Sequence, residues 1–211
     1  MTTSIAATTF VPGPRRGDPW IFVGLASSFP NVELDGTSLA EKRPCGSDTA
    51  AGCRVFQIPR VTAPGLVADD AAAAEEVQLG EGEEERFLEY LRGLKDQVLV
   101  FRYKGKFYAV DNRCPHSSYP LSNGTPFDIE DFGIVWSSGL TCPKHGWSFD
   151  LVTGNADRAN YQLGIWEVQL RPVAAGSSDE GRGAGTDGVG GTEGVAEGDS
   201  EVWVRRKQRI G

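Results

Sequence analysis

Two short motifs constrain this chain more than any other part of its sequence. The first is Cys-Pro-His at residues 114–116, and the second is Cys-Pro-Lys-His-Gly-Trp at residues 142–147. The chain has only two His in 211 residues, and both lie in these motifs together with two of the four Cys. Thiolates favour zinc, copper(I) and iron–sulfur centres, while imidazole favours borderline metals. The two motifs therefore predict one metal centre to which both segments contribute.

This pair of motifs resembles the two cluster-binding loops of the Rieske family. In a Rieske 2Fe–2S centre, His replaces Cys on one of the two irons. Carried over motif by motif, the resemblance implies that Cys114 and Cys142 bind one iron and that His116 and His145 bind the other. It implies a Rieske-type 2Fe–2S cluster as the cofactor and no catalytic residues. Leu121 stands at the family's usual distance after the first motif.

The resemblance also implies the fold and the domain organisation. We expect an all-β protein, a Rieske-type antiparallel β-sandwich or small barrel with a cluster-binding subdomain, to which one short helix and long disordered insertions are added. Residues 1–18 are expected to be a disordered N-terminus and residues 19–211 a single Rieske domain. Its expected parts are the cluster-binding loops at 114–121 and 142–154 and flexible insertions at 31–54, 68–85 and 174–200.

The hydrophobic pattern predicts most of the secondary structure independently of the resemblance. Runs rich in β-forming residues predict strands at Trp20–Leu25, Arg54–Ile58, Gln97–Tyr103, Phe107–Asp111, Ile165–Leu170 and Glu201–Arg205. The third and fourth runs form a predicted hairpin that leads into the first motif. Residues 127–136 are expected as a loop or ragged strand. Helical spacing of Phe87, Leu91 and Leu94 predicts the short helix. Four aromatic residues are expected in the core, namely Trp20, Trp136, Trp166 and Trp203.

The net charge of −8 is concentrated in two segments. Residues 68–85 carry a net charge of −8 and residues 174–200 carry −5, so the remainder of the chain is mildly basic at +5. The basic residues are not clustered or interleaved with aromatic residues, apart from a short run at 205–209. The sequence therefore does not favour a nucleic-acid partner.

We expect a cytoplasmic protein without a membrane partner. No stretch approaches the roughly 20 apolar residues that cross a bilayer, and the start of the chain lacks the layout of a secretory signal. Cys45 and Cys53 are expected to be reduced thiols, since disulfides are uncommon in the cytosol.

Three functions compete on the sequence alone. The first is a soluble Rieske-type ferredoxin, a one-electron carrier that passes electrons from a flavin reductase to an oxygenase or another acceptor. The second is the Rieske electron-transfer subunit of a multi-subunit oxygenase, in which a separate subunit supplies the mononuclear iron because both His are already used. The third is a structural zinc site of two Cys and two His, for which a Cys-x-His spacing is atypical.

Residues beside the ligands indicate which branch of the family the chain resembles. High-potential respiratory members have an extra Cys in each loop and a Ser and a Tyr that donate hydrogen bonds to sulfur. Here Tyr119 and Lys144 replace the two Cys, and Trp147 and Phe149 replace the Ser and the Tyr. Fewer donors to sulfur predict a low midpoint potential, on the order of −150 mV. Ser118 stands where the family usually has Gly.

Overall fold

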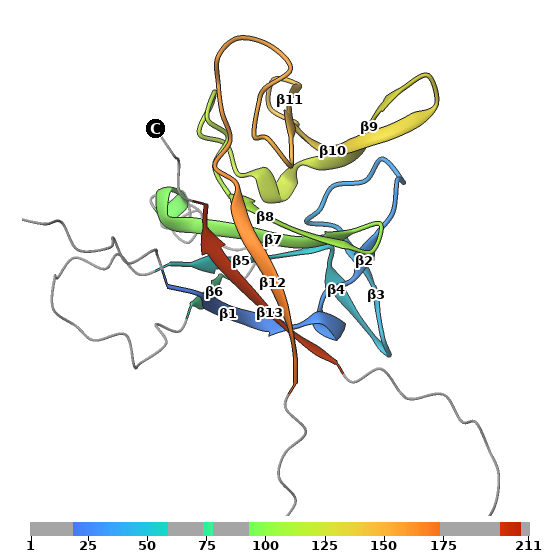
Figure 1. The fold of residues 1–211 in the computed structure, drawn as a ribbon, viewed down its shortest axis with the longest axis vertical. Helices are drawn as coiled ribbons and strands as arrows, with labels where there is room; N and C mark the ends of the chain where they lie inside the picture. Colours follow the sequence, from blue (N-terminus) through green and yellow to red (C-terminus); the bar gives the residue numbers. More distant parts are fainter. Residues whose placement is uncertain (1–18, 59–73, 78–92, 174–198, 208–211) are drawn as a thin grey trace, which may run out of the picture.

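The computed structural model describes residues 19–58, 74–77, 93–173 and 199–207, which form β-strands joined by turns and 3-10 helices (Figure 1). The predicted all-β fold is confirmed. The helix predicted from Phe87, Leu91 and Leu94 lies mainly on residues 78–92, outside the described ranges. In the described ranges, no helix is long and apolar enough to cross a membrane.

The strands form three sheets and a separate hairpin. The first sheet has the order β1-β13-β12, from Ile21–Leu25, Ser200–Arg206 and Trp166–Pro172. The second has the order β2-β7-β5-β6, with β8 also paired to β7, from Asn31–Val32, Gln97–Tyr103, Cys53–Gln57, Glu75–Val77 and Lys106–Asp111. The third has the order β11-β10-β9, from Trp147–Asp150, Ile134–Cys142 and Thr125–Asp131. The separate hairpin joins β3 and β4, from Lys42–Cys45 and Asp48–Ala51. The described 3-10 helices are η1 (Ala26–Ser28), η2 (Leu94–Asp96) and η3 (Leu121–Asn123).

Strand β7 lies at the centre of the fold because both of its faces are buried. Successive side chains of a strand point to opposite faces. Leu99 and Phe101 belong to a core that also contains the two motif cysteines, whereas Val98 and Val100 pack in a second core with β1, β12 and β13. The half of the molecule that contains the two cysteine motifs is therefore fixed to the rest of the fold through one continuous hydrophobic strand.

The predicted strands of the two flanks are confirmed. Strands β12 and β13 pair antiparallel even though residues 173–199 separate them in the sequence, and β13 also pairs with β1. The predicted hairpin of β7 and β8 turns at Lys104 and Gly105, both of which have positive φ (47° and 79°). A two-residue loop with this backbone matches the twist of the flanking strands.

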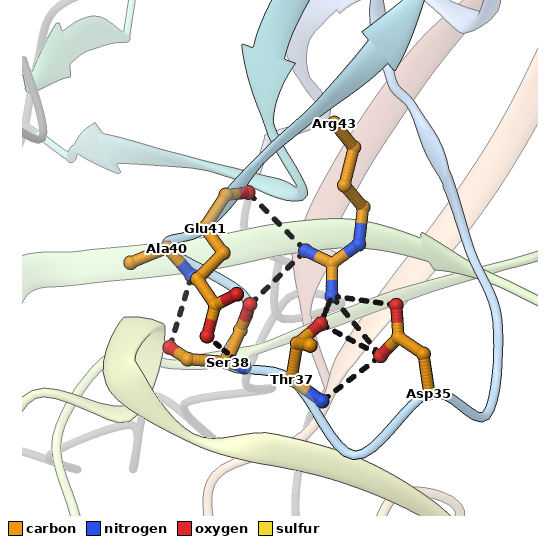
Figure 2. A network of polar contacts seen from close by, with 6 residues as sticks. All are labelled: Asp35, Thr37, Ser38, Ala40, Glu41 and Arg43. Carbon is orange, nitrogen blue, oxygen red and sulfur yellow. Dashed lines mark hydrogen bonds and ion pairs between the residues drawn. The ribbon is translucent and has the colours of Figure 1, made fainter.

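The prediction of a surface loop at residues 31–54 is wrong. This segment contains β2, β3, β4 and the start of β5, and it buries Val32 and Leu39 in the core. Figure 2 shows how Arg43 holds the segment together, because its guanidinium donates to the Ser38 and Glu41 carbonyls at 3.0 and 3.2 Å and also contacts Asp35 and Thr37. The polar composition that suggested a loop is used in these internal contacts.

Three further expectations differ from the structure. Within the acidic segment 68–85, Glu75–Val77 forms β6, where Glu76 makes an ion pair with Arg54 of β5. Residues 127–136, expected as a loop or ragged strand, form the end of β9, a turn at Phe132 and Gly133, and the start of β10, with a register shift between Val135 and Ser137. Trp136 is 71% exposed and does not belong to the core, whereas Trp166 is buried as expected.

Candidate metal centre

The first motif leaves the sheet at the end of β8 and is held at its base by one buried side chain. Asn112 donates through Nδ2 to the Gln97 side chain at 3.0 Å, and its Oδ1 accepts from the Ser122 N–H at 2.9 Å. Its carbonyl accepts from the Leu121 N–H at 3.1 Å. The amide therefore joins the start and the end of the loop, which fixes the position of Cys114 between them.

The second motif is the turn of the β10–β11 hairpin. Cys142 and Trp147 face each other as the last residue pair of that ladder. The Gly146 N–H donates to the Cys142 carbonyl at 3.0 Å, and Gly146 has a φ of 66°. The turn is tight because the residue four positions after the cysteine adopts the left-handed backbone.

The first loop repeats this geometry with a serine in place of the glycine. The Ser118 N–H donates to the Cys114 carbonyl at 2.8 Å, and Ser118 has a φ of 53°. Only glycine adopts this region at no steric cost. The Ser118 hydroxyl accepts from Arg113 Nε and Nη2 at 3.0 and 2.7 Å, which offsets part of the strain. The unusual residue singled out in the sequence thus occupies the equivalent position to Gly146.

The two motif thiols lie side by side in the interior. Cys114 and Cys142 are 0% and 1% exposed. Burial raises the pKa of the Cys142 thiol, and the neighbouring Cys114 raises it further, whereas the Lys144 N–H and the Ser117 hydroxyl favour the thiolate. The Ser117 Oγ lies 4.0 Å from the Cys142 Sγ. Two neighbouring buried thiols ionise together only when a nearby cation compensates their charge.

The two imidazoles are paired nearer to the surface. The ring centroids of His116 and His145 are 5.1 Å apart. His145 is exposed, whereas His116 is half-buried and stacks on the Trp147 indole at 4.3 Å with an interplanar angle of 20°. The Tyr161 ring contacts both His116 and Trp147 edge-on, at 5.6 and 5.1 Å. The aromatic side chains thus cover one imidazole and leave the other open to solvent.

Cationic side chains border this surface. The Arg158 guanidinium lies 5.5 Å from the Trp147 ring centre and donates to the Gly146 carbonyl at 3.1 Å. Lys144 Nζ lies 5.9 Å from the centre of the Tyr119 ring. These two residues stand where high-potential respiratory members have one extra Cys in each loop, and they contact each other between the loops. This contact links the two loops without a covalent bond.

The donor set fits a two-iron cluster better than a single ion. His116 Nδ1 is buried and has no hydrogen-bond partner in the described part of the chain, as expected of a nitrogen that faces a metal. Among the described residues, no three His, Cys, Asp or Glu side chains converge as a single metal ion would require. A structural zinc ion takes four converging ligands. A pair of thiols beside a pair of imidazoles is instead the arrangement in which each iron receives two protein ligands.

The structure pairs Cys114 with Cys142 and His116 with His145, and it adds residues to the site that the motifs did not reveal. Ser117 is adjacent to His116 in sequence, but Ser is too common for its type alone to indicate a contact with sulfur. Arg158 and Tyr161 follow the second motif outside any recognisable spacing, and they reach the site only because the chain folds back after β11.

Comparison with known proteins finds a family whose model matches the segment that contains this site. Residues 70–166 match the family model of the Rieske [2Fe-2S] domain. This segment of the chain, which contains both motifs, is therefore similar to Rieske domains. The similarity implies a Rieske-type 2Fe–2S cluster, which the donor set above is suited to hold.

Similar proteins include both electron carriers and larger enzymes. A human Rieske domain-containing protein is 41% identical over 58 residues, which are 28% of this chain and 34% of that protein. The 3-phenylpropionate/cinnamic acid dioxygenase ferredoxin subunit of Photorhabdus laumondii is 41% identical over 59 residues, 28% of this chain and 49% of that protein. The 4beta-methylsterol monooxygenase of Methylococcus capsulatus is 37% identical over 74 residues, 35% of this chain and 17% of that protein. The chain thus spans half or less of the length of these relatives.

A solved structure similar to this chain is the complex of reduced oxygenase and oxidized ferredoxin in carbazole 1,9a-dioxygenase. It is 19% identical, has a TM-score of 0.39, and covers 90% of this chain and 97% of that one.

Proposed function

We propose that this protein is a one-electron carrier that holds its 2Fe–2S cluster through Cys114, Cys142, His116 and His145. The observation that carries the proposal is the buried thiol pair beside a partly exposed imidazole pair. When bound, a Rieske cluster takes up and releases one electron at a potential that its ligands and hydrogen bonds set. We also propose that residues 19–211 form one Rieske domain, which the pairing of β1 with β13 supports.

The residues around the imidazoles suit a protein that exchanges electrons through a narrow surface. His145 is the ligand candidate that a partner protein reaches first, because its side chain is exposed. Trp147 and Tyr161 exclude water from His116 and hold its ring in one orientation. The rigid environment reduces the rearrangement that accompanies a change of charge.

We infer that the partners are a flavin-containing reductase as donor and an oxygenase or another redox protein as acceptor. The similarity to a dioxygenase ferredoxin subunit supports this class of partner. A role as the electron-transfer subunit within a multi-subunit oxygenase is the second candidate. Both His of this sequence are assigned to the cluster, so in either role another polypeptide segment supplies the His ligands of a mononuclear iron site.

The test combines cluster assembly with partner reduction. The purified protein should be coloured, and Cys142→Ser should lose the colour and the bound iron, while Cys45→Ser should keep both because Cys45 lies on β3 outside the site. Reductases recovered on the immobilised oxidised protein are then mixed with it and NADH in a stopped-flow instrument. Bleaching within the turnover time of the reductase supports the carrier role. Failure of every bound flavoprotein to reduce the coloured protein would refute it.

A further inference from the structure

The most exposed apolar segment of the described chain is the tip of the β9–β10 hairpin. Its side chains Phe132, Ile134, Val135 and Trp136 are 98%, 60%, 53% and 71% exposed. They are consecutive apart from Gly133, and the strands that present them extend away from the rest of the fold (Figure 1). Scattered single apolar residues are normal on a protein surface, but a contiguous group usually marks an interaction site.

The turn at this tip has a residue that its backbone disfavours. Phe132 and Gly133 form a two-residue loop with φ angles of 50° and 76°. Such turns prefer Asn, Asp or Gly at the first position, and a bulky residue with positive φ is an outlier. The β7–β8 hairpin has nearly the same turn angles at Lys104 and Gly105, but there the first residue is a lysine that pairs with Asp128. No comparable contact within the described chain compensates Phe132, which is almost fully exposed.

The adjoining strand has a second irregularity. The register of β9 with β10 shifts between Val135 and Ser137, which leaves Trp136 at a β-bulge. A bulge re-aims side chains and is a maintained feature of a fold rather than a defect. The strained turn and the bulge together keep three neighbouring residues of β10 exposed, from Ile134 to Trp136. Strain that brings no gain to the fold itself indicates a function for the segment that bears it.

We propose that this hairpin tip inserts into an apolar pocket on the surface of a redox partner protein, and that Lys and Arg residues of the partner border that pocket. The partner's charge is inferred from the flanking residues: Glu130 and Asp131 are exposed, and the sequence from Thr125 to Leu140 contains no Lys or Arg. Opposite charges across an interface steer the encounter and fix its register. The inference rests on the proposed function, because it assigns the occupant to the protein that exchanges electrons with the cluster.

Two other occupants fit the charges less well. Two copies of the chain meeting tip to tip would bring Glu130 and Asp131 of both copies together, and like charges at close range repel. Anionic lipid surfaces attract basic segments, whereas this tip has acids and no base.

The distance from the tip to the cluster loops is compatible with one partner. Strand β10 runs from Ile134 at the tip to Cys142 in the second loop. At about 3.3 Å per residue this strand is about 26 Å long. A protein interface of about 800 Å² per partner is about 30 Å across. One protein can therefore hold the tip and still reach His145.

The experiment begins with identification of the occupant. Phe132 is replaced by the photo-crosslinking residue benzoylphenylalanine in the full chain, and the same residue is placed at Leu34, an apolar position that is 55% exposed in the bend after β2, as the control. We expect position 132, and not position 34, to crosslink a protein that, once purified, reduces or oxidises the cluster in a stopped-flow assay. A crosslink to a second copy of the chain would overturn the proposal. So would the finding that no crosslinked protein exchanges electrons with the cluster.

The affinity of the identified partner is then measured for matched variants. Phe132→Asn and Trp136→Ser should each weaken binding about tenfold or more, as expected of apolar anchors in a docking site, whereas Leu34→Ser should not. Phe132→Asn should also raise the melting temperature, because Asn is favoured in this turn. Glu130→Lys should weaken binding at low salt and much less at high salt.

Two readouts separate this proposal from the carrier function. Reduction by dithionite and the spectrum of the cluster should be the same in all these variants, and a wild-type protein without colour would refute the carrier function before any partner is examined. Unchanged partner affinity in Phe132→Asn and Trp136→Ser, with normal clusters, would overturn the docking proposal alone. Binding of the wild-type chain to phosphatidylcholine vesicles that Phe132→Asn abolishes would overturn it in favour of a lipid surface.

Discussion

The replacement Ser117→Ala tests whether a hydrogen bond to a ligand sulfur sets part of the midpoint potential. The Ser117 Oγ is 4.0 Å from the Cys142 Sγ, at the long end of the range for a bond to sulfur. A donor to a ligand thiolate stabilises the reduced cluster more than the oxidised one, since the reduced form carries more negative charge. Removal of the hydroxyl should therefore lower the midpoint potential.

The size of the shift follows from the length of this contact. A hydrogen bond contributes about 0.5–1.5 kcal/mol net, and a long one belongs in the lower half of that range, about 0.5–1 kcal/mol. A tenfold change in a one-electron equilibrium corresponds to about 59 mV, or about 1.4 kcal/mol. The expected decrease is thus about 20–40 mV.

The assay is a redox titration of the purified variant followed by absorbance. Ser148→Ala is the matched control, because the Ser148 hydroxyl bonds to Thr141 Oγ1 at 2.9 Å and makes no hydrogen bond to sulfur in the described part of the chain. The control should have the same midpoint potential as the wild-type protein. A midpoint that rises in Ser117→Ala, or that falls equally in both variants, would refute this role of Ser117.

Three other predictions concern the fold around the site. Ser118→Val should lower the free energy of unfolding by about 2 kcal/mol, since a β-branched residue is strained at positive φ and the Arg113 hydrogen bond is lost. Ser118→Gly should leave the free energy of unfolding nearly unchanged in denaturant titration. Equal stability of the two variants would contradict the proposed strain at residue 118. Hydrogen bonding to Lys104 lowers the pKa of Asp128. This carboxylate therefore contributes stability above its unfolded pKa of about 3.9, and the contribution is lost as the pH falls through the lower folded pKa. Asp128→Asn should flatten that part of the stability–pH curve, and an unchanged curve would contradict this role of Asp128. Burial raises the pKa of the Cys53 thiol. Iodoacetamide should therefore modify the partly exposed Cys45 first in the native protein and Cys53 only after unfolding, as peptide mass spectrometry would show. Early modification of Cys53 would contradict its burial.

The sequence was most informative where chemistry limits the choice of residues. Cys and His are scarce in this chain, so their placement predicted the residues of the two pairs that the fold forms, Cys114 with Cys142 and His116 with His145. The β-rich runs predicted the strands on both flanks, because a strand buried on two faces such as β7 leaves a continuous apolar run.

The sequence was least informative where polar residues of one segment form contacts with one another in the folded chain. Residues 31–54 read as a loop because the contacts of Arg43 with Asp35 and Thr37 depend on the folded path of the backbone (Figure 2). Trp136 was expected in the core because large aromatic residues are usually buried, and its exposure follows from a register shift that no local pattern reveals. Tyr161 reaches His116 only through the return of the chain after β11.

The low midpoint potential remains a prediction from the same residues. Trp147 stacks on His116, and Phe149 is buried without a polar group that could donate to sulfur. The Ser117 hydroxyl is one donor near the Cys142 sulfur, so the potential should lie somewhat above that of an otherwise identical site without it.

Electron paramagnetic resonance of the dithionite-reduced protein, combined with its iron and sulfide content, tests the central claim most directly. The account predicts two irons and two sulfides per chain and a signal whose mean g value lies below that of the free electron, which disappears in His145→Ala and persists in Cys45→Ser. A colourless protein that contains one zinc ion per chain and gives no signal would contradict it.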